Sequence, residues 1–140
     1  MKLLHFTSLL LMLIVCTTEA KRYERCEFAR YLLNHGFNKT EIATWSCLAD
    51  HETKYDSKTH NKDTGEFGIL QINSKHWCSQ KSGGCGIPCQ SLLEDDIATS
   101  LECAKMVFED TARYKDSGFD AWYTYKFCKE NPNRYIVGCF

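Results

Sequence analysis

The sequence has no excess of charge of either sign: 17 lysines and arginines stand against 18 aspartates and glutamates, for a formal net charge of −1. A nucleic-acid-binding domain is expected to carry a basic patch or stripe. The basic group that stands out is Lys21, Arg22 and Arg25, which we interpret as a solvated segment. We therefore predict no nucleic-acid partner.

Long apolar runs are also scarce. The clearest one, Leu9 to Val15, is shorter than the ~20 apolar residues that a membrane-spanning helix requires. It follows a basic start at Lys2 and precedes small residues near Ala20, which is the pattern of a cleaved signal peptide. We predict a signal peptide over residues 1–20, a mature domain over residues 21–140, secretion, and no association with a membrane.

The chain has no internal repeat and no long linker, and its 140 residues suffice for one domain. Apolar residues recur at helical spacing in three segments. These are Cys26, Ala29, Leu32 and Leu33; Ile42, Trp45, Leu48 and Ala49; and Ile97, Leu101, Ala104 and Phe108. We expect Thr40 to cap the second helix, starting it at Glu41, and Gly118 to end the third.

A different pattern separates the second helix from the third. Turn-forming residues fill 61–65, and β-forming residues follow over Glu66–Asn73, which predicts a hairpin and a third short strand. Residues 79–86 are rich in glycine and serine and predict a loop, and Phe119–Phe127 predicts a short aromatic helix. Helices at both ends with a small sheet between them indicate an α+β domain.

Cysteine is abundant, with nine residues, of which Cys16 falls in the expected signal peptide. The remaining eight predict a disulfide framework in a small secreted protein, although spacing alone leaves all 105 pairings open. A zinc site at Cys85 and Cys89 is the alternative, but no matching histidine pair follows them.

The triplet Asn38-Lys39-Thr40 is an N-glycosylation sequon. If the site is used, it must lie on the surface of the folded protein. An unmodified surface loop fits the triplet equally well, so the sequence leaves glycosylation open.

Glu52 is the first candidate for chemistry. It falls seven residues after Trp45, on the apolar face of the second helix. Burial there would disfavour the charged form and raise its pKa, which would allow the carboxyl group to act as a general acid near neutral pH. The alternative is a glutamate at the end of a helix that reaches past the core into water, and periodicity alone favours that reading.

Glu66 is the second candidate, directly after the turn residues Thr64 and Gly65. Two carboxylates that face one cleft suit glycoside hydrolysis, in which one donates a proton and the other stabilises or attacks the sugar cation. Trp77 and Trp122 are candidate platforms for sugar rings, whereas Trp45 lies on an inner helical face and is expected in the core.

Other catalytic motifs are absent. His51-Glu52 begins like a zinc-protease helix, but Tyr55 occupies the place of the second histidine. No nucleophile-elbow serine motif occurs, and the acidic stretch 94–96 lacks the alternating ligands of a calcium loop. We therefore expect no metal and no cofactor.

These residues together resemble the c-type lysozyme and α-lactalbumin family over roughly Tyr23 to Cys139. The most specific stretch is Phe67–Ser74 followed by Trp77-Cys78. Supporting pieces are Cys26-Glu27, His35-Gly36, Trp45-Ser46-Cys47, Glu52, Cys89, Leu92-Leu93, Asp96-Ile97, Cys103-Ala104-Lys105 and Ala121-Trp122.

The resemblance implies a two-lobed domain with a deep cleft between helices and sheet. It also implies four disulfide pairings, which are Cys26–Cys139, Cys47–Cys128, Cys78–Cys89 and Cys85–Cys103. Glu52 matches the family's general acid, and Trp122 matches the tryptophan that desolvates it. The resemblance likewise implies catalysis by two carboxylates, which is established for this family. The substrate contacts that the resemblance implies are Gln71, Asn73, Trp77, Trp122 and the Ala121 backbone.

The chain departs from the family pattern at several positions. Glu66 stands where the family usually has an aspartate, so its carboxylate lies one methylene further out, and His76 replaces an aromatic residue that commonly stacks on sugar. Thr99 and Ser100 occupy positions of two carboxylates in the calcium-binding branch, which predicts no tight calcium site. Because strict alternation would place Glu66 and Asn73 on opposite faces of one strand, we expect a bend near Gly68.

By resemblance, the expected activity is that of a bacteriolytic, antimicrobial muramidase. It would act as a monomer on β-1,4 links between N-acetylmuramic acid and N-acetylglucosamine in peptidoglycan, in defence or digestion. Chitin-type oligosaccharides are a second expected substrate, because the same groups would grip either N-acetylated sugar. The rival hypothesis is a non-catalytic protein that binds sugar or a partner, since the fold does not guarantee catalysis.

Overall fold

The computed structural model describes residues 21–78 and 84–140. The expected signal peptide, and residues 79–83 of the expected loop, lie outside the described residues. No helix in the part of the chain that the structure describes is both long enough and apolar enough to cross a membrane.

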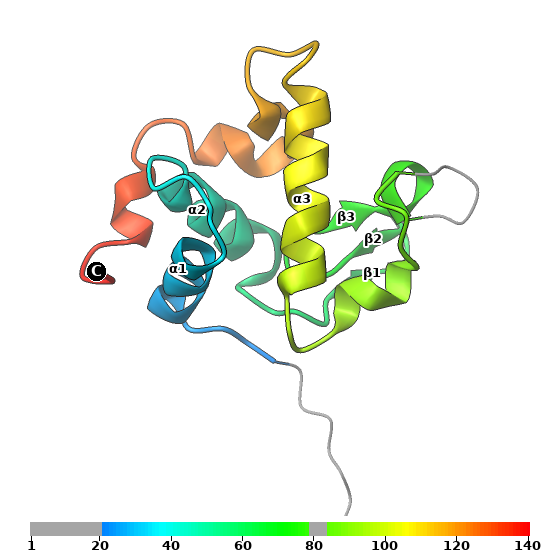
Figure 1. Ribbon diagram of the computed structural model, residues 1–140, viewed down its shortest axis with the longest axis horizontal. Coiled ribbons are helices and arrows are strands. Elements are labelled where there is room, and N and C mark those ends of the chain that lie inside the picture. The colour runs from blue at the N-terminus through cyan, green and yellow to red at the C-terminus, as the bar shows by residue number, and fades with distance from the viewer. Residues whose placement is uncertain (1–20, 79–83) are drawn as a thin grey trace, which may run out of the picture.

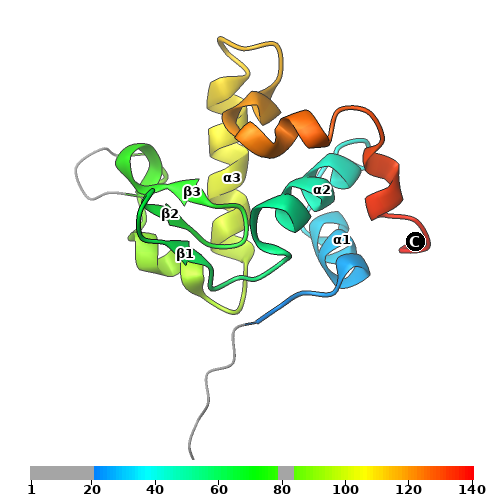
Figure 2. The same ribbon diagram turned by 180° about the vertical axis from the view of Figure 1, so that it is seen from behind.

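The domain has two lobes, with helices α1 and α2 on one side of α3 and a small sheet on the other (Figure 1; Figure 2 shows the reverse view). The three α-helices are α1 (Arg25–Asn34), α2 (Ile42–Thr53) and α3 (Ala98–Thr111). The strands are β1 (His60–Asn61), β2 (Glu66–Phe67) and β3 (Ile72–Asn73). Shorter helical segments are η1 (Ser74–Cys78), η2 (Cys89–Leu93), η3 (Gly118–Ala121), η4 (Tyr123–Phe127) and η5 (Pro132–Tyr135). The α+β architecture expected from the sequence is confirmed.

Helix α2 is a central part of the core, and nine of its 12 residues are buried. Trp45 is 1% exposed and anchors an aromatic cluster. Its ring contacts those of Phe37, Phe108, Phe119 and Trp122, with centroids 4.8–5.7 Å apart. Edge-on and tilted aromatic contacts of this kind add to the burial energy of the rings. The assignment of Trp45 to the core is confirmed.

Two expectations about helix ends are wrong. The residue before α2 is Glu41, which makes no side-chain cap, and the Thr40 hydroxyl instead donates to Asn38 Oδ1 at 2.9 Å. Asn38 captures Thr40 because an asparagine side chain readily accepts bonds from the residue two positions on. Helix α3 ends at Thr111, before Gly118, whose backbone packs so closely that an added Cβ would lie 2.4 Å from the Phe108 carbonyl oxygen.

The expected aromatic helix over Phe119–Phe127 is also wrong, because the segment forms two short 3-10 helices, η3 and η4. Trp122 separates them with an extended backbone (φ −104°, ψ 122°). Its buried indole nitrogen donates to the Leu70 carbonyl at 2.8 Å. This long-range bond fixes Trp122 in the core, which local periodicity could not reveal.

The sheet is antiparallel, in the order β1-β2-β3. Glu66 is the register partner of Asn73, and Phe67 that of Ile72. The bend expected near Gly68 is confirmed: Gly68 has a φ of +78°, and an added Cβ would lie 2.2 Å from the Leu92 carbonyl oxygen. The chain therefore turns between Glu66 and Asn73 and brings the two residues side by side on neighbouring strands.

All four disulfides implied by the resemblance are present, namely Cys26–Cys139, Cys47–Cys128, Cys78–Cys89 and Cys85–Cys103. Cys47–Cys128 joins α2 to the end of η4, and Cys85–Cys103 joins the loop before η2 to α3. Asn38 is exposed between α1 and α2, as a used sequon would require.

Candidate active site

A cleft of about 990 Å³ is lined by residues of both lobes. Helix α2 contributes Glu52, strand β2 contributes Glu66, and strand β3 contributes Asn73. The far wall comes from α3 and from the segment around Trp122. The two carboxylates expected to carry the chemistry therefore lie in one cleft.

Glu52 lies in the last turn of α2 and is half-buried. Its pKa is raised above the ordinary value, mainly because burial disfavours the charged form. A hydrogen bond of 2.5 Å from the Thr124 hydroxyl to Glu52 Oε1 opposes this shift by stabilising the carboxylate. The negative charge of Glu66 raises the pKa further. Glu52 is thus only partly buried, on the inward face of α2 and at the surface of the cleft.

Glu66 lies at the start of β2 and is partly exposed. The Thr64 hydroxyl donates to its Oε2 at 2.7 Å, which restrains the carboxylate from one side. Asn73 lies opposite on β3, and its Oδ1 accepts the backbone N–H of Lys75 at 2.9 Å. That bond fixes the orientation of the Asn73 amide and does not use its NH₂ group.

Trp122 packs into the wall of the same cleft and is 6% exposed. Its ring lies edge-on to Trp45 at 5.3 Å, so the aromatic core extends to the cleft surface. Ala121 and Trp77 line the cleft as well. The structure thus brings Trp122, Ala121, Trp77 and Asn73 into one cavity with both carboxylates.

Gln71 also lines the cleft, but its side chain is 8% exposed and is used inside the protein. Its amide nitrogen donates to the carbonyl oxygens of Thr59 and Gly68 at 3.1 and 2.9 Å. Gln71 has a φ of 50°, in the left-handed region that few residues other than glycine adopt. Through these two hydrogen bonds, Gln71 stabilises the bend between β2 and β3.

Several cleft residues were not found from the sequence. Thr124, which binds Glu52, carries no motif and lies 72 positions from its partner. Tyr123 is 80% exposed at the cleft rim, and the Lys126 ammonium group lies 3.7 Å from its ring centroid. Asp110 on α3 and Arg113, two residues beyond the end of that helix, form an ion pair of 3.8 Å along the wall. The available signal was proximity to Trp122, since Tyr123 and Thr124 follow it directly.

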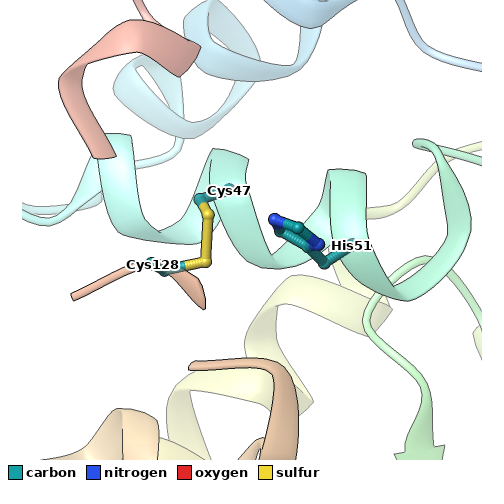
Figure 3. A group of neighbouring side chains, drawn as sticks. All are labelled: Cys47, His51 and Cys128. Carbon is teal, nitrogen blue, oxygen red and sulfur yellow. A yellow bond between two sulfur atoms is a disulfide. The ribbon is translucent and has the colours of Figure 1, made fainter. Parts of the chain in front are cut away.

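One group of side chains among the described residues has the spacing of a metal site, formed by Cys47, His51 and Cys128 (Figure 3). The two sulfur atoms are joined in a disulfide and offer no thiolate to a metal. The His51 ring is stacked on Phe127, and its Nε2 lies 3.1 Å from the Tyr135 hydroxyl. We interpret this group as part of the packing between α2 and the C-terminal segments.

Comparison with known proteins decides the family. The family model described as "C-type lysozyme/alpha-lactalbumin family" matches residues 21–139. The chain belongs to this family. This C-type lysozyme family member is 37% identical to "Lysozyme C-1" of Rattus norvegicus, over 91% of the chain and 93% of the relative. It is also 37% identical to "Lysozyme c-1" of Anopheles gambiae, over 96% and 98%.

A solved structure agrees with this assignment. The crystal structure of a lysozyme from Litopenaeus vannamei superimposes on this family member with a TM-score of 0.77 at 33% sequence identity. The match covers 86% of this chain and 98% of the other. The lysozyme-like fold that the resemblance implied is therefore confirmed.

Proposed function

We propose that this C-type lysozyme family member is a secreted muramidase that hydrolyses the β-1,4 links between N-acetylmuramic acid and N-acetylglucosamine in peptidoglycan. The proposal depends on one observation: Glu52, with a raised pKa, shares a cleft with a second carboxylate, Glu66. Relatives named lysozyme C support the same reaction class.

In the proposed mechanism, Glu52 in its acid form donates a proton to the glycosidic oxygen as the bond to the sugar C1 breaks. The ionised Glu66 stabilises the resulting cation, or traps it as a glycosyl ester. Water then attacks C1 and gives its proton to Glu52, which regenerates both groups and retains the configuration at C1. The chemistry requires no cofactor.

The neighbouring residues are proposed to hold the sugar in place. The amide NH₂ of Asn73 and the backbone of Ala121 would bind an N-acetyl group. Trp77 and Trp122 would offer apolar faces, and Gln71 would act by holding the bend that carries Asn73. These groups suit any N-acetylated sugar, so chitin-type oligosaccharides are a second proposed substrate.

Glu66 is one methylene longer than the aspartate usual in the family, and reaction rates are sensitive to displacements of about 1 Å. The Thr64 hydroxyl restrains the longer side chain by binding Oε2. We propose that this bond keeps the carboxylate within reach of the sugar C1.

The test is clearing of a bacterial cell-wall suspension together with release of reducing ends, measured from pH 4 to 8. Glu52→Gln should lower the rate by ~100-fold or more, the usual contribution of a general acid. Glu66→Gln should also lower it by ~100-fold, the scale of an electrostatic contact to the transition state. Glu102→Gln, at an exposed position on α3 outside the cleft, is the matched control.

The rival is a non-catalytic protein that binds sugar or a partner, for which Glu66 at the aspartate position is the supporting observation. A correctly bridged wild-type sample that binds wall fragments without releasing reducing ends would establish the rival. If Glu66→Gln equals wild type, the mechanism with two carboxylates is wrong. Chitin oligomers assayed in parallel distinguish the two substrates.

A further inference from the structure

Thr124 is the polar side chain that contacts the proposed acid directly. It lies in η4, is half-buried, lines the cleft, and donates its hydroxyl hydrogen to Glu52 Oε1. Glu52 itself comes from the end of α2, so the bond joins two elements that line the cleft. The oxygen-to-oxygen distance is 2.5 Å.

We propose that Thr124 is a positioning residue for Glu52, whose hydroxyl holds Oε1 as an acceptor and so assigns the transferable proton to Oε2. This inference rests on the function proposed above. In a neutral carboxyl group the carbonyl oxygen is the stronger acceptor, so a bond accepted at Oε1 favours the proton on Oε2. Oε2 would therefore donate the proton to the glycosidic oxygen, and the same atom would take a proton back from water in the second step.

The position of Thr124 also suits a glutamate that must act first as an acid and then as a base. Burial raises the pKa of Glu52 and favours the acid, whereas the bond from Thr124 stabilises the carboxylate and lowers the pKa. The hydroxyl thus counteracts burial, so that Glu52 can serve as an acid in the first step and as a base in the second. A cleft wall without this donor would favour the acid form more strongly.

Other groups face the same space. Glu66 on β2 raises the pKa of Glu52 through its negative charge. His76 on η1 lines the cleft, as does the ion pair between Arg113 and Asp110 at the end of α3. Lys126 on η4 binds the neighbouring Tyr123. A pH profile of activity therefore combines several titrations, and the titration of Glu52 must also be observed directly.

The experiment compares wild type with Thr124→Val, Thr124→Ala and Thr124→Ser. Carbon-13 NMR of the glutamate side-chain carboxyl groups reports the Glu52 pKa without any need for turnover. We expect a higher pKa in Thr124→Val and Thr124→Ala and a wild-type value in Thr124→Ser. Thr99→Val is the control, because Thr99 is half-buried on α3 and does not line the cleft.

Kinetics on a soluble N-acetylglucosamine oligomer supply the second readout. We expect kcat to fall about tenfold in the valine and alanine variants, the equivalent of one lost hydrogen bond, with KM within about twofold of wild type. The alkaline limb of the kcat profile should move to higher pH, and serine should restore both properties. A role limited to stability would lower the melting temperature without moving the Glu52 titration.

The proposal is overturned if the valine and alanine variants titrate like wild type, or if the serine variant behaves like the valine variant. Failure of the proposed function looks different. In that case wild type releases no reducing ends, while the NMR titration of Glu52 still moves when the Thr124 hydroxyl is removed.

Discussion

Glu66 and Asn73 are directly opposed on strands β2 and β3, so their side chains emerge on the same face of the sheet. The pairing places an amide beside a carboxylate at the point where the sheet meets the cleft. We therefore propose that one cross-strand pair serves both roles: Asn73 binds the sugar, and Glu66 stabilises the positive charge that develops on it.

Asn73→Ala tests this pairing. We expect KM for a soluble N-acetylglucosamine oligomer to rise about tenfold, because the amide NH₂ would lose its bond to the substrate. The kcat value should change less, since Glu66 remains on β2. Asn133→Ala, at an exposed position in η5, should leave both constants unchanged. An unaltered KM in Asn73→Ala would show that the amide does not bind the sugar.

Gly68→Ala should lower the free energy of unfolding by about 2–4 kcal/mol, measured by urea denaturation. The substitution adds a Cβ at a φ of +78° and only 2.2 Å from the Leu92 carbonyl oxygen. Gly36→Ala is a matched control, because its φ is +74° but no atom lies within 4 Å of the added Cβ. It should cost only about 1 kcal/mol, the strain of the left-handed backbone. Equal losses in the two variants would contradict the role of close packing at Gly68.

Glu52→Gln should make the protein more stable than wild type at neutral pH. Because burial raises the pKa of Glu52 above the ordinary 4.5, the folded protein binds its proton more tightly than the unfolded chain does. The wild type therefore loses stability as pH rises from about 4.5 through the folded pKa, whereas the glutamine variant does not.

Thermal unfolding at several pH values measures this difference. We expect the melting temperatures to converge below pH 4.5 and the variant to exceed wild type by a few degrees at pH 7. A difference that stays constant across the range would mean that the acid titrates alike in the folded and unfolded states.

Trp122→Phe should lower the free energy of unfolding by about 1–3 kcal/mol, since it leaves the Leu70 carbonyl without the indole donor. The smaller ring should also admit water beside Glu52 and lower its pKa toward the ordinary value. Tyr123→Phe removes a hydroxyl group from a residue that is 80% exposed, and should change stability by less than about 0.5 kcal/mol. Denaturation and NMR titration together check both expectations.

The sequence predicted the parts of the fold that depend on local patterns or on resemblance. Helical stripes located α1, α2 and α3, and the inward face of α2 placed Glu52 in a half-buried position. The disulfide pairing came from the resemblance alone, since cysteine spacing leaves every pairing open.

Two of the parts that were missed depend on contacts between distant segments. Trp122 interrupts an aromatic helix by binding Leu70, and Thr124 binds Glu52, which lies on another element. The third is a local competition, because Asn38 binds the Thr40 hydroxyl two positions further on and Thr40 does not cap α2. The bend between Glu66 and Asn73 could be predicted, because strict alternation along one strand does not allow both residues to face the cleft.

The Cys47–Cys128 disulfide lies close in sequence to both partners of the central contact, five residues before Glu52 and four after Thr124. The Glu52 carboxyl group and the Thr124 hydroxyl are thus connected by a short covalent path through α2, the disulfide and η4. While the disulfide is intact, this path limits how far the two groups can separate when the surrounding packing loosens. We therefore expect reduction of the Cys47–Cys128 disulfide to separate Glu52 from Thr124 more effectively than heating does.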